Sequence, residues 1–434
     1  MNNLIHSIFD GKRTIILGFG REGKESFNLI SKYIPSELIT IADQNDSSIP
    51  DNIKQQYRCI TGPDYLENIN YFDIIVKSPG ISEHFMEGIP EDKITSQTDI
   101  FLQQYHNRVI GITGTKGKST TSSLIAHMLT TAGIKNVLVG NIGIPAFSAL
   151  NSIDDETVIV MELSAHQLNH IKTAPHIALF LNIREEHLDH FGTFEQYFKA
   201  KCNIFTKQGE NDILIIDRRE KEITDRILNS PTSVVSHIES INIENTKDMP
   251  TQLRGQHNKT NLAFAAEAVS HFNIPREIIE EGARSFTPLP HRLQYVGTYS
   301  GIEFYNDSIS TIPDSAMAAM SALGNVGTII LGGFDRGISY KKFAKHLAKC
   351  NGLNIIATGD AGKRICELVK EQNYSCNIFY AANMKEIIEL AFEHTPKDTK
   401  CLLSPAASSY DQYKNFEERG RYYVTCIHDY VETH

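Results

Sequence analysis

The sequence predicts an α/β protein of three domains, each built around a parallel sheet that is covered on both faces. Two observations lead to this class. The chain has 434 residues, a length typical of about three domains. Strand-like runs that end in glycine- or proline-containing turns alternate with helical patterns along most of it. We expect the domains to span residues 1–96, 97–289 and 290–434.

The composition excludes several classes of protein. Apolar residues make up 41% of the chain and charged residues 22%, as in a soluble globular protein. The formal net charge of −10 argues against a nucleic-acid partner or a membrane-surface protein, because both need a positive field. The seven cysteines form no CxxC pattern, and there is no apolar leader and no apolar run long enough to span a bilayer. We expect a cytoplasmic protein without a disulfide framework.

The first segment opens with a strand, a glycine turn and a helix. The turn reads Gly18-Phe19-Gly20-Arg21-Glu22-Gly23, and Asp43 ends the next strand. This spacing matches the Rossmann dinucleotide fingerprint, in which loop amides bind a diphosphate. From the turn alone, NAD(P) and other anionic ligands such as a UDP-sugar are equally favoured. The turn Ser78-Pro79-Gly80 follows a neighbouring strand and would add amides to the same crevice.

The second segment contains the strongest single motif, Gly114-Thr115-Lys116-Gly117-Lys118-Ser119-Thr120. A predicted strand at 109–112 precedes it and a predicted helix at 119–129 follows, so loop amides and the helix N-terminus would converge on phosphate. The motif reads GxxGKS, because Ile112 stands where the longer Walker pattern has its first glycine. Lys118 would reach the phosphates and the Ser119 hydroxyl would bind Mg²⁺. We favour this interpretation over a plain glycine turn with a surface lysine.

Other polar residues of the second segment are less specific. Glu162 ends an apolar strand, where a carboxylate would bind Mg²⁺ beside the loop or face solvent. His187 and His190 allow a zinc site, although no further His or Cys pair follows at metal spacing. Lys201, taken alone, is typical of a solvated lysine. Residues 220–249 are polar and weakly patterned, and we expect a surface excursion without chemistry.

The third segment begins near a predicted hairpin turn at Gly301 and continues with strands at 328–333 and 353–360. Compact polar clusters follow its strands, as expected of loops that face a crevice. Arginine in such clusters is suited to binding carboxylate or phosphate, while Asn, Asp, Ser and Gly are equally typical of turns. The clusters are His291-Arg292, Asn306-Asp307-Ser308, Asp335-Arg336 and 404–416.

In this order, the motifs resemble those of the Mur ligase family of ATP-dependent amide-bond ligases. The resemblance implies an N-terminal Rossmann-like domain for a UDP-sugar, a central phosphate-loop ATPase-like domain for ATP and a C-terminal Rossmann-like domain for glutamate. It displaces the NAD(P) interpretation. The stretches that carry it are GITGTKGKST (111–120), GNIGIPA (140–146), MELSAHQL (161–168), NIREEHLDH (182–190), KAKCNIF (199–205), GQHNKTN (255–261), PHR (290–292), YNDS (305–308), LGGFDRG (331–337) and SPAASSYDQYKNFEERG (404–420).

The resemblance also implies a role for each site residue. The ATP-binding residues would be Gly114, Thr115, Lys116, Gly117, Lys118, Ser119, Thr120, Asn258, Asn261, Arg292 and Asp307. The ligands of two Mg²⁺ ions would be Ser119, Glu162, His187 and a carbamylated Lys201, and the catalytic residues Lys118, His187 and Lys201. The UDP-sugar would contact Gly18, Gly20, Gly23, Asp43, Ser78, Pro79, Gly80 and Asn141. The glutamate would contact Arg336, Ser409 and Phe416.

The implied reaction adds D-glutamate to UDP-N-acetylmuramoyl-L-alanine through an acyl phosphate, at the expense of ATP, in peptidoglycan precursor synthesis. We expect a monomer whose domains close to bring the glutamate to the γ-phosphate. Two positions depart from the family: Lys116, where Asn is usual, and Ile309, where many glutamate-adding members have a lysine. The second departure leaves L-glutamate open. A folylpolyglutamate-type ligase and a phosphate-loop switch protein also stay open as functions.

Overall fold

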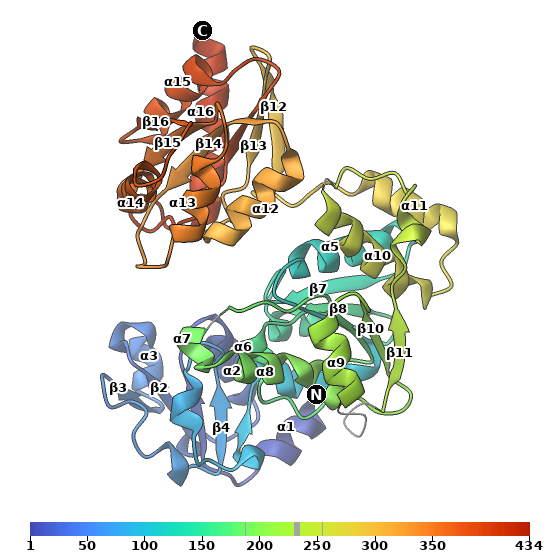
Figure 1. Ribbon diagram of the computed structural model, residues 1–434. Coiled ribbons are helices and arrows are strands. Elements are labelled where there is room, and N and C mark those ends of the chain that lie inside the picture. Colours follow the sequence, from blue (N-terminus) through green and yellow to red (C-terminus); the bar gives the residue numbers. More distant parts are fainter. Residues whose placement is uncertain (187, 230–234, 254) are drawn as a thin grey trace. The chain divides into compact units, whose positions relative to one another are not determined.

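The computed structural model describes residues 1–434 apart from 187, 230–234 and 254 (Figure 1). Three sheets run through the described residues, and the strands of each lie within one of the three predicted segments. The chain divides into two compact units: residues 1–251 with 257–286, and residues 252–256 with 287–434. The first unit therefore contains two of the sheets, and the second unit contains the third. The predicted domain boundaries themselves stay predictions.

The first sheet is parallel throughout, in the order β3-β2-β1-β4-β5. The predicted glycine turn lies between β1 and α2. One face packs under helices, whereas the other is covered by connecting segments that contribute Ile69 and Met86. Both faces of this parallel sheet are thus covered, as expected, one by helices and the other by these connecting segments. The elements are α1 (Asn2–Phe9), β1 (Thr14–Leu17), α2 (Arg21–Ile30), β2 (Ile39–Asp43), α3 (Asp51–Lys54), β3 (Arg58–Thr61), β4 (Ile74–Lys77), β5 (Ile94–Thr95) and α4 (Gln97–Tyr105).

The second sheet is also parallel, in the order β11-β10-β9-β6-β8-β7. Its central strand β6 lies between β9 and β8, so the loops after these three strands emerge at one edge. The elements are β6 (Val109–Thr113), α5 (Lys118–Thr131), β7 (Asn136–Gly140), β8 (Val158–Glu162), α6 (Ala165–Leu168), β9 (Ile177–Phe180), α7 (Leu188–Phe191), α8 (Phe194–Thr206), β10 (Ile213–Ile216), α9 (Lys221–Asn229), β11 (His237–Ser240), α10 (Gln256–Ser270) and α11 (Arg276–Ser285).

The segment 220–249 differs from its expectation. Instead of a surface excursion, it supplies helix α9 and the edge strand β11, which pairs in parallel with β10. β11 is only four residues long, His-Ile-Glu-Ser, and its first residue is exposed while the other three are half-buried. Such a short edge strand is recognised by its pairing and not by its own apolar content.

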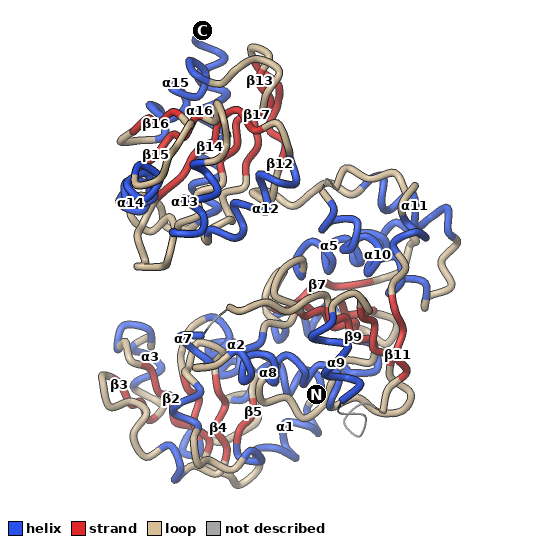
Figure 2. The backbone as a smooth tube through the Cα atoms, viewed as in Figure 1, coloured by secondary structure: helices blue, strands red, loops and turns tan. Residues whose placement is uncertain are grey.

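The third sheet is mixed, in the order β12-β13-β17-β14-β15-β16. β12 and β13 form the predicted hairpin around Gly301 and are antiparallel, while the remaining pairs are parallel. Figure 2 shows helices on both sides of this sheet, and an apolar cluster lies on each face. The elements are β12 (Gln294–Tyr299), β13 (Ile302–Asn306), α12 (Pro313–Leu323), β14 (Val326–Gly332), α13 (Lys341–Ala348), β15 (Asn354–Thr358), α14 (Gly359–Lys370), β16 (Asn377–Tyr380), α15 (Met384–His394), β17 (Lys400–Leu403) and α16 (Phe416–Thr433).

One apolar core joins the first two sheets into a single unit. It contains Ile16 and Val76 of the first sheet, Ile159 and Met161 of the second, and Phe101 of the helix α4 that connects them. Burial of this kind contributes roughly 1.5–3 kcal/mol per large side chain. The glycine turn of the first sheet and the phosphate loop of the second therefore belong to one packed body.

Candidate active site

The phosphate loop connects β6 to α5 at the carboxyl edge of the second sheet. Its last glycine, Gly117, has φ of +87°, and a Cβ there would lie 2.4 Å from Oδ1 of Asn261 on α10. Glycine alone tolerates both the backbone conformation and this close approach. Ser119 and Thr120 follow in the first turn of α5 and are buried. The predicted strand, turn and helix are confirmed at this point.

Asn182, two residues after the end of β9, fixes the shape of the loop. Its side-chain Oδ1 accepts from the Lys116 amide at 2.9 Å, and its Nδ2 donates to the Lys116 carbonyl at 3.0 Å. Its own carbonyl accepts from the Thr115 amide at 2.9 Å. Sequence reasoning gave Asn182 no role. The signal that points to it is its position as the first polar side chain after a buried strand beside β6.

Two lysines converge on one carbonyl of the loop. Lys118 donates from Nζ to the carbonyl of Gly114 at 2.9 Å and to that of Thr115 at 3.1 Å. Lys201, on α8, donates to the same Gly114 carbonyl at 2.9 Å and to Oγ1 of Thr113 at 3.3 Å. The solvated lysine that Lys201 suggested in isolation is therefore wrong, since the side chain is 1% exposed.

Burial gives the Lys201 amine an unusual character. Loss of solvent lowers the pKa of Lys201 well below its ordinary value, and the charge of Lys118 lowers it further, while Glu186 and Glu162 offset part of this. The Tyr197 ring lies 5.0 Å from its Nζ. Burial therefore disfavours the ammonium form of Lys201 relative to the neutral amine, whose nitrogen carries a lone pair.

Glu162, at the end of β8, fits a ligand of a divalent cation. The side chain is 1% exposed, and its Oε1 accepts from Nδ2 of Asn141 at 2.7 Å. No donor among the described residues reaches its second oxygen, Oε2, which is buried. An unpaired buried carboxylate oxygen is costly unless a cation binds it. Asn141 thus lies against Glu162, beside the phosphate loop.

The other predicted metal ligands are only partly described. His187 lies outside the described residues. His190 stacks edge-on with His166, with ring centroids 4.2 Å apart. Within the described part of the chain, no group of three His, Cys, Asp or Glu side chains is placed to hold a metal ion. The zinc interpretation thus gains no support, and the magnesium set depends on Ser119, Glu162 and Lys201.

The remaining predicted ATP-binding residues fall in different units. Asn258 and Asn261 lie on α10 in the first unit, where Nδ2 of Asn261 donates to Oδ1 of Asn258 at 3.0 Å. Arg292 and Asp307 lie in the second unit. Asp307 is 5% exposed, and burial raises its pKa to about 6, partly offset by hydrogen bonds from Ser310, Ser404 and the Leu293 amide and by the charge of Arg292.

The glycine turn of the first sheet is held by two polar side chains. Asp43 accepts from the Phe19 amide at 2.6 Å, and Oγ of Ser78 donates to the Gly18 carbonyl at 2.8 Å. A Cβ on Gly23 would lie 1.8 Å from that same carbonyl, so only glycine allows α2 to pack this close. Gly20 precedes α2. The structure therefore brings the Gly18–Gly23 and Ser78–Gly80 turns together, as predicted.

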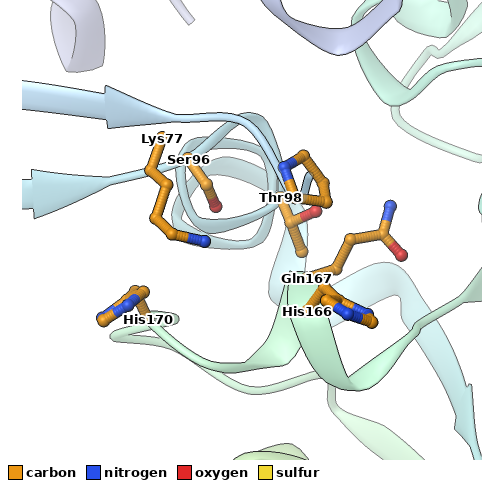
Figure 3. Close-up of a pocket in the computed structure, with 7 residues that line it drawn as sticks. Lys77, Ser96, Thr98, His166, Gln167 and His170 are labelled. Atoms are coloured by element: carbon orange, nitrogen blue, oxygen red, sulfur yellow. The ribbon is translucent and has the colours of Figure 1, made fainter. Parts of the chain in front are cut away.

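A small cavity lies where the first sheet meets α6 of the second (Figure 3). Lys77 reaches it from the end of β4, and His166, Gln167 and His170 reach it from α6 and the residues after it. Pro79, Ser96 and Thr98 complete its lining.

Beside this cavity, Glu83 pairs with Lys77 at the end of β4 and with His170 after α6. Its Oε1 lies 2.8 Å from Nζ of Lys77 and its Oε2 lies 2.7 Å from Nε2 of His170. Sequence reasoning missed this carboxylate, because its partner His170 is 87 positions away.

The predicted glutamate-binding residues all lie in the second unit. Arg336 donates from Nη2 to the Thr311 carbonyl at 3.0 Å, and Ser409 is 2% exposed. Phe416 begins α16, and its carbonyl accepts from Oγ of Ser308 at 2.8 Å. Arg336 and Phe416 bond to different residues, and the assignment of all three to one pocket stays a prediction.

Arg419 has a structural role that the sequence did not predict, although it lies in the conspicuous stretch 404–420. It is 4% exposed and donates to Oγ of Ser308 at 3.0 Å, to the Ser308 carbonyl at 2.9 Å and to the Ala407 carbonyl at 3.1 Å. Burial lowers its pKa to about 10. Its guanidinium thus ties α16 to the loop after β13.

The fold and the loop define a class of protein before any comparison: an α/β protein with a phosphate-binding loop and a neighbouring carboxylate suited to a divalent cation. None of the helices described in the structure has the length and apolar content needed to cross a membrane.

Comparison with known proteins narrows this class. Residues 112–271 match the Mur ligase middle domain, and residues 291–407 match the Mur ligase glutamate ligase domain. A protein of Desulfitobacterium hafniense (strain Y51) named UDP-N-acetylmuramoylalanine--D-glutamate ligase is 31% identical, over 96% of this chain and 97% of its own. A Salinispora tropica protein named UDP-N-acetylmuramoyl-L-alanine--L-glutamate ligase is 29% identical, over 96% and 98%.

Among solved structures, MurF from Acinetobacter baumannii has the same fold, with a TM-score of 0.64 and 15% identity over 100% of this chain and 98% of that one. The chain belongs to the Mur ligase family. It is an enzyme of the ligase class, as its family resemblance implied.

Proposed function

We propose that the chain is an ATP-dependent ligase that adds D-glutamate to UDP-N-acetylmuramoyl-L-alanine in peptidoglycan precursor synthesis. The observation that carries the proposal is the convergence of Lys118 and Lys201 on the Gly114 carbonyl, with the unpaired Glu162 oxygen nearby. The name of the Desulfitobacterium relative, which aligns over almost the whole chain, supports the choice of substrates.

The proposed chemistry has two steps. The terminal alanine carboxylate attacks the γ-phosphorus of ATP, so that a new O–P bond forms and ADP leaves. The glutamate amine then attacks the acyl carbon of this acyl phosphate, phosphate leaves, and the nitrogen loses a proton. Both steps bring anions together, so the protein's contribution is positioning and charge neutralisation. The loop amides and Lys118 perform this task at the transferred phosphate.

Mg²⁺ would be held by Ser119, Glu162, His187 and a modified Lys201. When bound, it neutralises phosphate charge. We propose that the buried Lys201 amine, in its neutral form, adds to carbon dioxide and loses a proton to give a carbamate. This converts a cation into an anionic oxygen ligand. The depressed pKa of Lys201 supports this step.

The other two substrates would use the first sheet and the second unit. The UDP-sugar would bind the turns at Gly18–Gly23 and Ser78–Gly80, with Asp43 holding the first turn in shape. Asn141, which lies against Glu162, would contact the same substrate. Arg336, Ser409 and Phe416 would bind glutamate. A complete first domain disfavours a folylpolyglutamate-type ligase, which needs no site for a uridine diphosphate.

A second candidate is the same ligation with L-glutamate. It is favoured by Ile309, which stands where many glutamate-adding relatives have a lysine, and by the name of the Salinispora relative.

One experiment distinguishes these functions. The full chain is mixed with ATP and Mg²⁺, with or without UDP-N-acetylmuramoyl-L-alanine, and phosphate release is followed with D-glutamate, L-glutamate or neither. Phosphate release that requires D-glutamate supports the proposal. A requirement for L-glutamate selects the second candidate. Release without glutamate or sugar nucleotide would identify an ATPase switch and contradict both.

A further inference from the structure

Lys116 differs from the two other lysines at the phosphate loop, Lys118 and Lys201 of α8. The ammonium groups of Lys118 and Lys201 turn inward to loop carbonyls. That of Lys116 turns outward and lies 2.8 Å from Oε1 of Glu186, with a side chain that is 51% exposed. The outer lysine therefore lies on the solvent side of the loop, next to the Gly117-Lys118 pair that is proposed to bind the phosphates.

The backbone of Lys116 cannot follow its side chain. Both its amide and its carbonyl are bonded to the side chain of Asn182, and the next residue, Gly117, packs against Asn261. Only the flexible four-carbon stem is free to swing. The ion pair with Glu186 opposes this motion modestly, because the Lys116 side chain is half-exposed and solvent screens the pair.

Glu186 itself lies close to the proposed reaction centre. Its charge acts on Lys201 in the same direction as that of Glu162, so both carboxylates are within electrostatic reach of that amine. A carboxylate at this place would repel an incoming triphosphate. Lys116 neutralises it before nucleotide binds and can transfer its charge to the phosphate afterwards.

We infer that the Lys116 ammonium exchanges Glu186 for the γ-phosphate of bound ATP, and that Lys116 thereby distinguishes ATP from ADP. The inference depends on the proposed function and deepens it by adding a third phosphate-binding lysine. An asparagine, usual at this position in the family, is too short to make the exchange. The side chain, and not only the backbone, of this loop residue therefore contributes to nucleotide selection.

The test compares affinities for Mg²⁺-ADP and for Mg²⁺ with the β,γ-imido analogue of ATP, measured by calorimetry on the full chain. Lys116→Met is expected to weaken binding of the analogue about tenfold or more, since a charge-assisted hydrogen bond is lost, and to change ADP binding by less than about twofold. Lys116→Arg, which keeps the cation, should restore most of the difference.

Lys135 offers a matched control. It is similarly exposed, at 55%, and is also paired with a carboxylate, Asp154, in the same unit. Lys135→Met should leave both affinities unchanged. If Lys116→Met weakens both nucleotides equally, or neither, the inference is overturned.

A second variant separates nucleotide contact from a purely structural ion pair. Glu186→Gln breaks the pair but keeps Lys116, so the ratio of analogue affinity to ADP affinity should not fall. A fall as large as that of Lys116→Met would show that the pair only holds the loop in place.

Lys118→Ala separates this inference from the proposed function. If that variant binds both nucleotides normally, the proposed function fails; if it loses them while Lys116→Met does not, only the inference fails.

Discussion

At the scale of single residues, burial decides what Lys201 does. On an exposed helix face this side chain would be an ordinary cation, but in the structure it is enclosed and shares a carbonyl with Lys118. We predict that Lys201→Ala lowers ligation by about a hundredfold or more, because a proposed ligand of Mg²⁺ is lost. Acetate or another short-chain carboxylic acid should restore part of the rate by replacing the carbamate. Steady-state kinetics with and without the acid measure both effects.

Lys199 provides the control for this variant, since it lies on the same helix and is exposed. Lys199→Ala should keep full activity and show no response to acetate. Full activity in Lys201→Ala would show that Lys201 is not part of the active site. Lys118→Ala is also expected to abolish ligation; if only this variant were inactive, Lys118 would act without Lys201.

Asp307 shows the opposite effect of burial on a carboxyl group. Its pKa is raised to about 6, so the folded unit binds this proton more tightly than the unfolded chain does. The stabilisation is complete below the unfolded pKa near 4 and is lost as the pH rises through about 6. We predict that Asp307→Asn raises the unfolding free energy by about 1–2 kcal/mol at about pH 7.5, with no gain at about pH 4. The same variant should lose ligation.

Chemical denaturation at the two pH values measures this difference. Asp314→Asn, at an exposed position of α12, controls for the general effect of removing an acid. Equal destabilisation of Asp307→Asn at both pH values would show that its hydrogen bonds from Ser404 and the Leu293 amide matter more than its charge.

At the scale of elements, the phosphate loop works because α10 closes against it. We predict that Gly117→Ala lowers nucleotide affinity about tenfold or more, because its Cβ would displace Asn261 and strain the backbone. Gly133→Ala is the matched control. Gly133 also has positive φ, +72°, but a Cβ added to it would meet no atom within 4 Å. This substitution should cost about 1 kcal/mol of stability and leave nucleotide binding intact. Calorimetric titration with Mg²⁺-ADP, together with thermal unfolding, separates the two effects; equal affinities would contradict the role of α10.

Elements with a strong local signal could be predicted from the sequence. The loop between β6 and α5 was identified because its glycines, lysine and flanking apolar strand lie next to one another in the chain. β11 was missed because its four residues form a strand only through pairing with β10. Pairing also explains why Asn182 escaped notice, since it bonds a loop residue 66 positions away. Residues that are adjacent in the chain are thus enough to predict the type of an element, whereas contacts with distant residues are needed to predict β11 and the role of Asn182.

The same limit applies to charge. The net charge of −10 predicts no polyanionic partner, yet the proposed substrates are all anions. The structure resolves this by placing Lys116, Lys118 and Lys201 around one loop. A total charge averages over the surface, whereas binding depends on a few groups within a Debye length of each other.

At the scale of the whole molecule, Glu83 connects the first sheet to the second within one unit. Its side chain is 19% exposed, and its partners Lys77 and His170 are 3% and 12% exposed. Burial, the largest single influence, raises the pKa of Glu83, but the hydrogen bond from His170 and the charge of Lys77 outweigh it and lower the pKa to about 2. This carboxylate therefore stabilises the unit above the unfolded pKa near 4.5, and the contribution is lost as the pH falls towards 2.

We predict that Glu83→Gln lowers the unfolding free energy of this unit by about 2–3 kcal/mol at about pH 7, because Lys77 is left buried without its paired charge. The difference from the parent chain should shrink at about pH 3, because there the carboxyl group of the unfolded parent, with a pKa near 4.5, is mostly protonated while that of the folded parent is still mostly ionised. Denaturant titrations at both pH values measure it. Asp154→Asn is the informative comparison: the pKa of Asp154 is also lowered to about 2, but its pair with Lys135 is exposed and solvent-screened. If Glu83→Gln and Asp154→Asn lower the unfolding free energy by the same small amount, the burial of the Glu83 ion pairs contributes nothing. The shared apolar core alone would then hold the two sheets together.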